Sequence, residues 1–332
     1  MPVPQTVHNC RVLPYLDPAD RRPVESLSVV VCSYTTERWD DLCRSVDSVL
    51  ADDAPALQVV IVIDHNDELF ALAAARFVDD LRIILRRNTG KRGLSGARNT
   101  GVEAADGEVV AFLDDDAAVQ PGWSRALLSH YEDPRVVGVG GHAAPVWPQG
   151  RPLWMPAEFD WVVGCSYVGQ PDRVALVRNP LGCNMSLRRS VFTHLGGFRS
   201  EVGRVGSVPV GGEETELFLR LRARRPSDRV LLDPAAAVRH WVSPDRATPR
   251  YFLSRCYHEG LSKAVVTRLA AAPGSLDSEQ SYATRVLPRA VAREAVSPRR
   301  GGRRRAAMMV LGLGATTAGY VRGALARRSG WA

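Results

Sequence analysis

The sequence has few cysteines, and they follow no metal-binding pattern. Six occur in 332 residues, without a Cys-x-x-Cys pair and without a His/Cys cluster at zinc spacing. A structural zinc site of the usual kind is therefore disfavoured. Several cysteines lie inside apolar runs, as in Val30-Val31-Cys32, where a thiol behaves as a small buried hydrophobe. We accordingly expect free thiols in a reducing compartment.

A secretory leader and a membrane-spanning run are absent as well. Residues 1–23 contain no charged head followed by an apolar stretch, which disfavours a signal peptide and predicts a cytoplasmic protein. The uncharged segment Ala306–Val321 has sixteen residues, whereas a spanning helix needs about 20. A segment that lies on a surface or docks on the protein fits better; a solvated tail is the alternative.

Positive charge is concentrated near the C-terminus. The formal net charge is +7, and from Arg285 onward the chain carries eleven arginines against one acid, Glu294. Such a tail attracts anionic lipid headgroups, so we expect peripheral contact with the inner face of the cell membrane. Nucleic acid is not expected as a partner, because stacking aromatics are not interleaved with these arginines.

Alternating apolar runs and helical segments predict an α/β fold. The composition, with 45% hydrophobic and 24% charged residues, is that of a soluble globular protein. Short valine-rich runs separated by helical periodicity predict a mostly parallel sheet flanked by helices. The strands are expected at 27–32, 59–63, 82–85, 109–113 and 136–139. We predict an irregular lead-in at 1–26, a catalytic domain at 27–245 with halves 27–140 and 141–245, a helical extension at 246–296 and a basic, apolar tail at 297–332.

Three adjacent carboxylates, Asp114, Asp115 and Asp116, directly follow the predicted strand 109–113. In such sheets ligands bind beyond the carboxyl ends of the strands. Carboxylates this close repel one another, and a cation among them would relieve the repulsion. Mg²⁺ or Mn²⁺ is the cation that this pattern favours; a turn of solvated acids is the alternative. Asp64 ends the second strand and could either bind a ligand or cap the next helix.

The order of these motifs resembles glycosyltransferase family 2, a group of inverting enzymes with the GT-A fold. The likeness spans residues 27–242. The motifs that carry it are Ser33-Tyr34-Thr35, Asp64, Asn88-x-Gly90, Ala97-Arg98-Asn99-x-Gly101, Asp114-x-Asp116, Gly196-Gly197-Phe198 and Gly212-Glu213-Glu214.

The resemblance implies a nucleotide-sugar donor, a metal ion and a base. Asp64 would contact the nucleobase, Asp114 the ribose or the metal, and Asp116 the metal. His240 would be a further metal or diphosphate ligand, although a lone histidine is as often structural. The nucleotide-binding set that we expect is Ser33, Tyr34, Glu37, Asp64, Arg98, Asp114 and Asp115.

The sequence departs from the family pattern at the catalytic base. A glycine-rich stretch, 208–212, leads into Glu213 and Glu214, where the family usually has Asp at the last position. The resemblance assigns Glu214 as the base that deprotonates the acceptor hydroxyl, with Glu216 as the second candidate. Acids in the first turn of a helix also complement its dipole, so a purely structural role is the alternative.

Two further segments resemble the branch of glucosyl-dolichyl-phosphate glucuronosyltransferases. They are Arg255–Ala264 and the aromatic stretch Trp154–Trp161. This likeness implies a UDP-sugar donor and a glycan or lipid-linked acceptor. Contacts to the sugars are assigned to Glu213, Trp161, Arg255 and Lys263. Solvated charges and core aromatics are the simpler interpretation of these residues taken singly.

Two other functions stay open on the residues alone. A sugar-nucleotide nucleotidyltransferase would also use a metal and carboxylates, but it needs a basic, glycine-rich loop after the first strand, where this chain has Cys32–Glu37. A non-catalytic nucleotide-sugar-binding protein at the membrane is compatible with the unusual Glu214. A dehydrogenase is disfavoured, because Gly-x-Gly-x-x-Gly does not follow the first strand.

Overall fold

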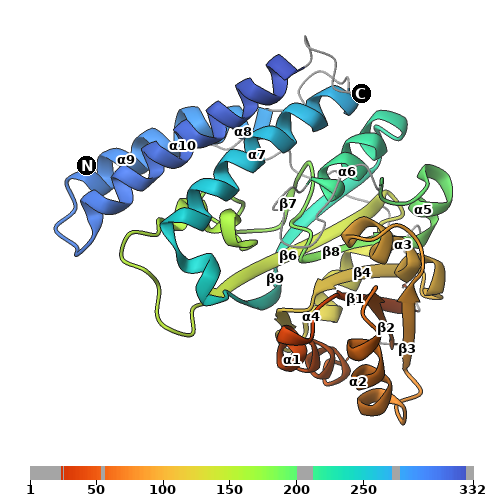
Figure 1. Ribbon diagram of the computed structural model, residues 1–332. Helices are drawn as coiled ribbons and strands as arrows, with labels where there is room; N and C mark the ends of the chain where they lie inside the picture. The colour runs from red at the N-terminus through yellow and green to blue at the C-terminus, as the bar shows by residue number, and fades with distance from the viewer. Residues whose placement is uncertain (1–23, 25, 54–56, 200–211, 271–276, 327–332) are drawn as a thin grey trace.

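The computed structural model describes residues 24, 26–53, 57–199, 212–270 and 277–326. One nine-stranded sheet is formed by strands between Leu27 and Trp241, and a group of helices from the C-terminal third lies along one side of it (Figure 1). Most of the expected lead-in, the glycine-rich stretch before Gly212 and the arginines at 327 and 328 lie outside the described residues. The sheet order is β3-β2-β1-β4-β8-β6-β9-β5, and β7 pairs with β9.

The first four strands of the sheet are parallel, and three of them, β1, β2 and β4, are buried on both faces. Strand β1 pairs with β2 and β4, and β2 pairs with β3. Alternate side chains enter two separate cores: Val29 and Val31 face one, whereas Val30 faces the other. Burial on both faces explains why β1, β2 and β4 appear in the sequence as unbroken apolar runs. The bounds are β1 (Leu27–Ser33), β2 (Leu57–Asp64), β3 (Ile83–Asn88) and β4 (Val109–Asp114).

Helices cover both faces of this half. The helices α1, α2 and α4 contribute to the first core, and α3, α5 and α6 contribute to the second. Strands β1, β2 and β4 therefore end in a common edge that the covering helices leave open to ligands. The helices are α1 (Trp39–Leu50), α2 (Asp67–Phe77), α3 (Leu94–Ala104), α4 (Trp123–Ser129), α5 (Arg189–Leu195) and α6 (Glu213–Arg224).

The second half of the sheet is mixed. Strand β8 runs antiparallel to both β4 and β6, while β6 and β9 are parallel and β5 runs antiparallel to β9. Strands β6 and β9 therefore run in the same direction as the first four, and β5, β7 and β8 run against them, so the sheet is mostly parallel, as the sequence predicts. The bounds are β5 (Ala117–Val119), β6 (Val136–Val146), β7 (Ala175–Leu176), β8 (Asn184–Arg188) and β9 (Arg229–Trp241).

The predicted C-terminal extension is helical, and the tail continues it as a docked helix. Helix α10 (Gly302–Leu325) runs alongside α7 (Pro249–Ala270), with α8 (Asp277–Ser281) and α9 (Leu287–Ala295) next to them (Figure 1). A third core joins these helices to the aromatic stretch, where Phe159 packs on Phe252. Most of those aromatics are therefore structural. No helix within the described ranges is long and apolar enough to cross a membrane.

Glycine contacts hold α10 against α7, and one substitution should separate the two helices. In Gly319→Ala the new Cβ would lie 2.0 Å from the carbonyl oxygen of Tyr257, so the backbones must move apart. Gly314→Ala is the matched control, since nothing in the described part of the chain lies within 4 Å of its Cβ. The control should gain about 0.5–1 kcal/mol from helix propensity. Thermal unfolding followed by circular dichroism should show a lower melting temperature for Gly319→Ala only; equal melting temperatures would contradict this packing.

Candidate functional site

A pocket opens at the carboxyl ends of β1, β2 and β4, where the sequence predicts ligand binding. The N-terminus of α6, the end of β9, helix α7 and the 3-10 helix η4 (Ala157–Val163) form its other walls. Eleven of the residues expected at the site line it: Ser33, Tyr34, Asp64, Arg98, Asp114, Asp115, Trp161, Glu213, Glu214, His240 and Arg255. The polypeptide thus brings together side chains that are more than 200 residues apart.

Asp114, Asp116 and His240 form a three-residue group suited to a metal ion. The strand pairing places His240 opposite Ala117, directly after the acidic turn. One ligand atom from each of the three residues lies within 4.8 Å of the other two. The buried Oδ1 of Asp116 lies 3.1 Å from His240 Nε2, yet it has no hydrogen-bond partner among the described residues. Two carboxylates and an imidazole whose ligand atoms lie this close together can bind one cation, so these residues fit a divalent metal.

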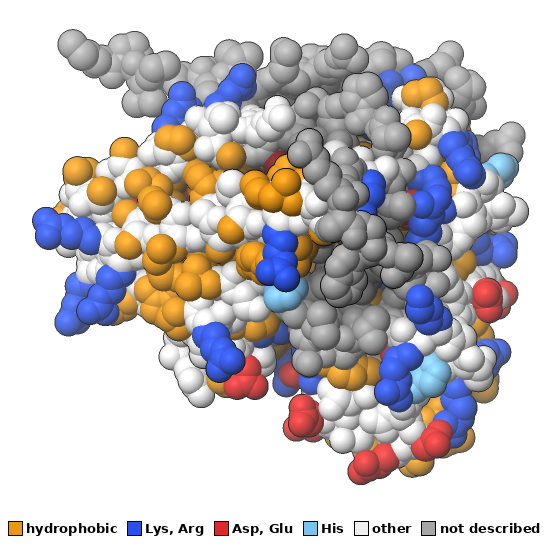
Figure 2. Space-filling model, turned by 45° about the horizontal axis from the view of Figure 1, so that its top comes forward, with side chains coloured by type: hydrophobic (Ala, Val, Ile, Leu, Met, Phe, Trp, Pro, Cys, Tyr) orange, Lys and Arg blue, Asp and Glu red, His pale blue; other side chains and the backbone are white. Residues whose placement is uncertain are grey.

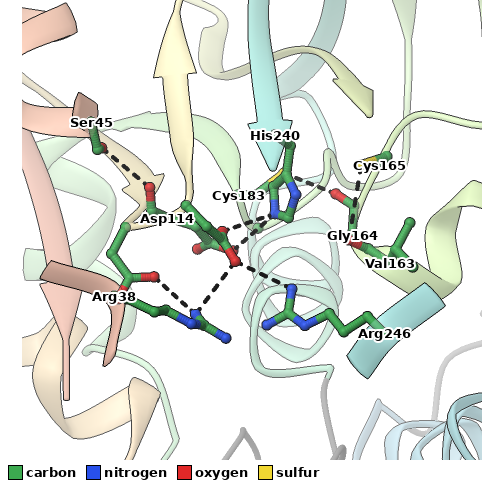
Figure 3. A network of polar contacts seen from close by, with 12 residues as sticks. Arg38, Ser45, Asp114, Val163, Gly164, Cys165, Cys183, His240 and Arg246 are labelled. Atoms are coloured by element: carbon green, nitrogen blue, oxygen red, sulfur yellow. Dashed lines mark hydrogen bonds and ion pairs between the residues drawn. The ribbon is translucent and has the colours of Figure 1, made fainter. Parts of the chain in front are cut away.

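Two arginines neutralise the acidic turn from the opposite side. Arg38, in the 3-10 helix η2 (Thr36–Arg38), lies 3.0 Å from Asp115 Oδ1 and 3.4 Å from Asp116 Oδ2. Arg246, in the 3-10 helix η5 (Pro244–Ala247), lies 3.2 Å from Asp116 Oδ2. Figure 3 shows both arginines converging on the acids, with His240 on the other side. Burial opposes ionisation of Asp116, but His240 and Arg246 hold the pKa of its carboxyl well below the usual range.

Asp115 has a different role from its neighbours. Its Oδ2 accepts a hydrogen bond from Ser33 Oγ at 2.6 Å, and its Oδ1 accepts one from Arg38. Burial raises the pKa of this carboxyl to about 6, against the opposing charge of Arg38. Both oxygens have protein partners, so Asp115 joins the end of β1 to η2 rather than offering a free ligand atom.

Asp64 organises the loop that follows β3. Its Oδ1 accepts from Asn88 Nδ2 at 2.6 Å, and its Oδ2 accepts from the backbone nitrogen of Gly93 at 2.9 Å. Asn88 Oδ1 in turn accepts from the nitrogen of Gly90. The second asparagine of the family motif, Asn99, bonds both backbone groups of Phe198. Three of the motifs found in the sequence therefore fix the backbone that surrounds the pocket.

A buried ion pair joins α3 to α6. Arg98 Nη1 lies 2.8 Å from Glu213 Oε1, and both side chains are at most 5% exposed. The same guanidinium donates to the carbonyl oxygen of Gly182 at 2.9 Å and lies 3.4 Å from Asp114. These contacts hold the amino end of α6 against the carboxyl end of β4, the two elements that carry the site.

Arg98→Met should leave the Glu213 carboxylate buried without its partner. Removing one member of a buried pair is typically destabilising by about 3–5 kcal/mol, and urea unfolding would measure that loss. The matched double variant Arg98→Met with Glu213→Gln also removes the orphaned charge, so it should recover part of the stability. If the single variant unfolds at the same urea concentration as the unaltered protein, the pair does not join the two elements.

Glu214 faces the pocket from the first turn of α6. The helix begins after Gly212, whose φ of 106° is in the left-handed region. Burial and the neighbouring charge of Glu213 raise the pKa of the Glu214 carboxyl to about 7, while Arg98 opposes the shift. A carboxylate of this basicity can accept a proton near neutral pH.

The second candidate base, Glu216, is held away from the pocket. Arg220 binds both of its carboxylate oxygens, at 3.0 and 2.7 Å, and Arg199 lies 3.2 Å from one of them. Arg220 also donates to the carbonyl oxygens of Leu195 and Gly197. Glu216 therefore supports the Gly-Gly-Phe loop, which favours Glu214 as the base.

The charged residues of α7 form a chain that leads away from the pocket. Arg255 lines the pocket and pairs with Glu259 at 2.8 Å. Lys263 lies one turn further and binds Glu259 at 3.2 Å and Glu279 at 2.5 Å. Arg178 binds Glu279 as well. Lys263 does not line the pocket, and neither does the exposed Glu37, whose backbone nitrogen donates to Thr35 Oγ1.

Sequence reasoning missed Arg38 and Arg246. Both arginines, together with Tyr251, line the pocket. Arg38 follows the expected nucleotide-binding loop closely, so its position in the chain could have indicated it. Arg246 is 130 residues from its partner Asp116, and a pair that far apart in the chain leaves no local sequence pattern.

Comparison with known proteins gives one consistent family. Residues 28–196 match the model of "Glycosyl transferase family 2". The "Glucosyl-dolichyl phosphate glucuronosyltransferase" of Haloferax volcanii is 36% identical over 257 residues, which cover 77% of this chain and 81% of that protein.

Two solved structures share the fold. A mannosyltransferase of Pyrobaculum calidifontis in complex with GDP-Man and Mn²⁺ has a TM-score of 0.56 at 19% identity, over 93% of this chain and 90% of that chain. GalNAc-T7 with UDP, GalNAc and Mn²⁺ has a TM-score of 0.53 at 18% identity, over 75% of this chain and 52% of that chain. The chain has the GT-A fold and belongs to glycosyltransferase family 2.

Proposed function

We propose that this glycosyltransferase moves a sugar from a nucleoside diphosphate donor to an acceptor hydroxyl with inversion of configuration. One observation carries the proposal: Asp114 and His240, which form a metal-type group with the adjacent Asp116, line one wall of the pocket, and the basic carboxylate of Glu214 lines another. The first three suit the diphosphate end of a donor, and Glu214 suits the acceptor hydroxyl. The half 27–140 then binds the nucleotide, and the half 141–245 supplies the acceptor site.

The reaction needs one displacement at the anomeric carbon. The acceptor oxygen forms the new glycosidic bond as the bond to the nucleotide diphosphate breaks, and Glu214 takes the proton that the hydroxyl loses. Because a single displacement inverts the carbon, an α-linked donor gives a β-linked product. The helix N-terminus beneath Glu214 favours its ionised form, whereas burial raises its pKa to about 7. Glu214 can therefore both accept and release a proton near neutral pH.

Asp114, Asp116 and His240 would hold Mn²⁺ or Mg²⁺. When bound, such an ion would neutralise the charge that develops on the diphosphate leaving group. The imidazole ligand favours Mn²⁺, because Mg²⁺ prefers an all-oxygen shell. Arg38 and Arg246 hold the ionised acids in place.

The donor that we favour is a UDP-sugar, with UDP-glucuronate as the leading candidate. Support comes from the 36% identical relative, whose printed name includes glucuronosyl transfer to a dolichyl phosphate-linked glucose. On the site itself, Arg255 is a cation in the pocket wall that can pair with a donor carboxylate. A lipid-linked or polysaccharide glycan is the matching acceptor class.

A donor screen tests the proposal. Purified protein is incubated with UDP-, GDP- and dTDP-sugars in the presence of Mn²⁺, Mg²⁺ or EDTA, and release of the nucleotide diphosphate is measured. Metal-dependent release from UDP-glucuronate would support the full proposal. Release from UDP-glucose alone would overturn the sugar but leave the reaction class intact. Tight binding of donors with no release, even with lipid-linked glucose added, would contradict an enzymatic role.

A further inference from the structure

Helix α10 presents several large apolar side chains outward, whereas three of its glycines, Gly312, Gly319 and Gly323, are buried. Gly312 packs against Phe252, and Gly319 lies on the backbone of Tyr257. On the outer side five large apolar side chains are between 38% and 57% exposed: Val310, Leu311, Leu313, Val321 and Leu325. In a surface helix of a soluble domain the large apolar residues normally face the core. For these five residues of α10 the arrangement is the reverse.

The small residues on the inner side of α10 explain how closely it packs on α7. They do not explain why its outer face is apolar. Close approach at Gly312 and Gly319 buries the helix backbone against α7 without using the leucines and valines. Scattered exposed apolar residues need no explanation, whereas a contiguous patch on one element marks an interaction surface. In Figure 2 hydrophobic side chains gather over the elongated part of the molecule that α9 and α10 form in Figure 1.

Basic residues flank this apolar face. Arg303 and Arg304 are exposed at its amino end, directly after Arg299 and Arg300, and Arg322 is exposed near its carboxyl end. The segment 302–326 contains no acidic residue. Figure 2 shows basic side chains at the outer end of the apolar patch. An apolar strip with arginines at both ends is typical of a helix that lies in the interface of an anionic bilayer.

A second copy of the chain suits the surface less well. Two such helices packed face to face would bring arginines together, since α10 offers no carboxylate to meet them. An anionic lipid surface supplies both the negative charge and the apolar phase that the face requires. We propose that α10 docks lengthwise on anionic membranes, with its outer apolar side chains in the headgroup–acyl boundary.

The docked orientation would also bring the pocket close to the bilayer. Helix α10 lies against α7, and α7 carries Arg255 in the pocket wall. A lipid-linked acceptor could then reach Glu214 without leaving the membrane; this consequence rests on the proposed function, whereas docking itself does not.

Vesicle flotation tests the docking directly and needs no activity. The full chain is mixed with phosphatidylcholine vesicles, with and without phosphatidylglycerol, at low and high salt. We expect binding only with the anionic lipid and weaker binding at high salt. Leu311→Gln with Leu325→Gln should lower the partition coefficient roughly tenfold or more, and so should Arg303→Gln with Arg304→Gln.

Matched controls carry the same chemical changes elsewhere. Val78→Gln with Leu81→Gln alters two highly exposed apolar residues after α2, and Arg222→Gln with Arg224→Gln removes two exposed charges from α6. Both controls should bind vesicles like the unaltered protein, and melting temperatures should confirm that all variants fold. Absence of binding to anionic vesicles, or equal losses in the controls, would overturn the proposal. A dimer in solution that only the α10 leucine variant dissociates, without vesicle binding, would overturn it in favour of self-association.

Discussion

Glu214→Gln is expected to reduce the rate of sugar transfer by about a hundredfold or more while leaving nucleotide binding intact. The amide keeps the shape of the side chain but cannot take the proton of the acceptor hydroxyl, and general-base catalysis typically contributes 10²–10⁴-fold. Glu214 lies in the pocket wall, and the ion pair of its neighbour Glu213 with Arg98 holds its helix in place. Steady-state transfer rates and calorimetric nucleotide binding would measure the two effects separately.

The pH profile adds an independent check on the same residue. Because burial and Glu213 raise the pKa of Glu214 to about 7, the ionised base is populated above that pH, and the transfer rate should rise through neutrality. Glu214→Asp restores the residue usual in the family and should keep part of the activity. Glu216→Gln, which alters a carboxylate bound by Arg220, should affect stability more than the pH profile. Full activity in Glu214→Gln would exclude Glu214 as the base.

Asp116→Asn is expected to weaken Mn²⁺ binding by about a hundredfold or more and to lower donor turnover in parallel. The carboxylate supplies the buried Oδ1 that lies 3.1 Å from His240 Nε2, and replacing it by an amide removes the negative charge that a divalent cation needs. Even residues that only support metal ligands typically alter affinity 10–100-fold. Electron paramagnetic resonance titration of free Mn²⁺ would measure the affinity.

Asp115→Asn is the matched comparison at the adjacent position. Both oxygens of Asp115 are already bound, by Ser33 and Arg38, so this variant should retain Mn²⁺ affinity within a few-fold. Melting temperatures are needed for both variants, because each removes a charge that faces Arg38. Equal loss of Mn²⁺ affinity in the two variants would show that the acidic turn holds the metal by its total charge rather than through Asp116.

The parallel half of the fold could be predicted because its signals are local. Valine runs such as the one at β1 are buried on both faces, and a strand of that kind reads as an unbroken apolar segment. The acids that end β2 and β4 then fall at one edge of the sheet through the topology alone. The family motifs added Glu214, which composition and spacing would have left as a helix-capping acid.

The short strands β5 and β7 and the two arginines could not be predicted in the same way. Strands β5 and β7 have three and two residues, too few for an alternating pattern to be recognised. Arg246 reaches Asp116 only through the path that β9 takes across the sheet. For α10, the sequence showed an apolar segment with basic flanks. Which of its residues face the protein, such as Gly312 and Gly319, is set by contacts with α7 and could not be predicted.

The anomeric form of the first-released sugar shows whether the pocket performs a single displacement with Glu214 as base. With an α-linked donor, Mn²⁺ and no acceptor, water takes the place of the hydroxyl, and proton NMR can identify the first-formed sugar before mutarotation. We expect the β-anomer to form first, at a rate that Glu214→Gln reduces. An α-anomer formed first would contradict it, since retention requires two displacements and a covalent sugar–enzyme intermediate.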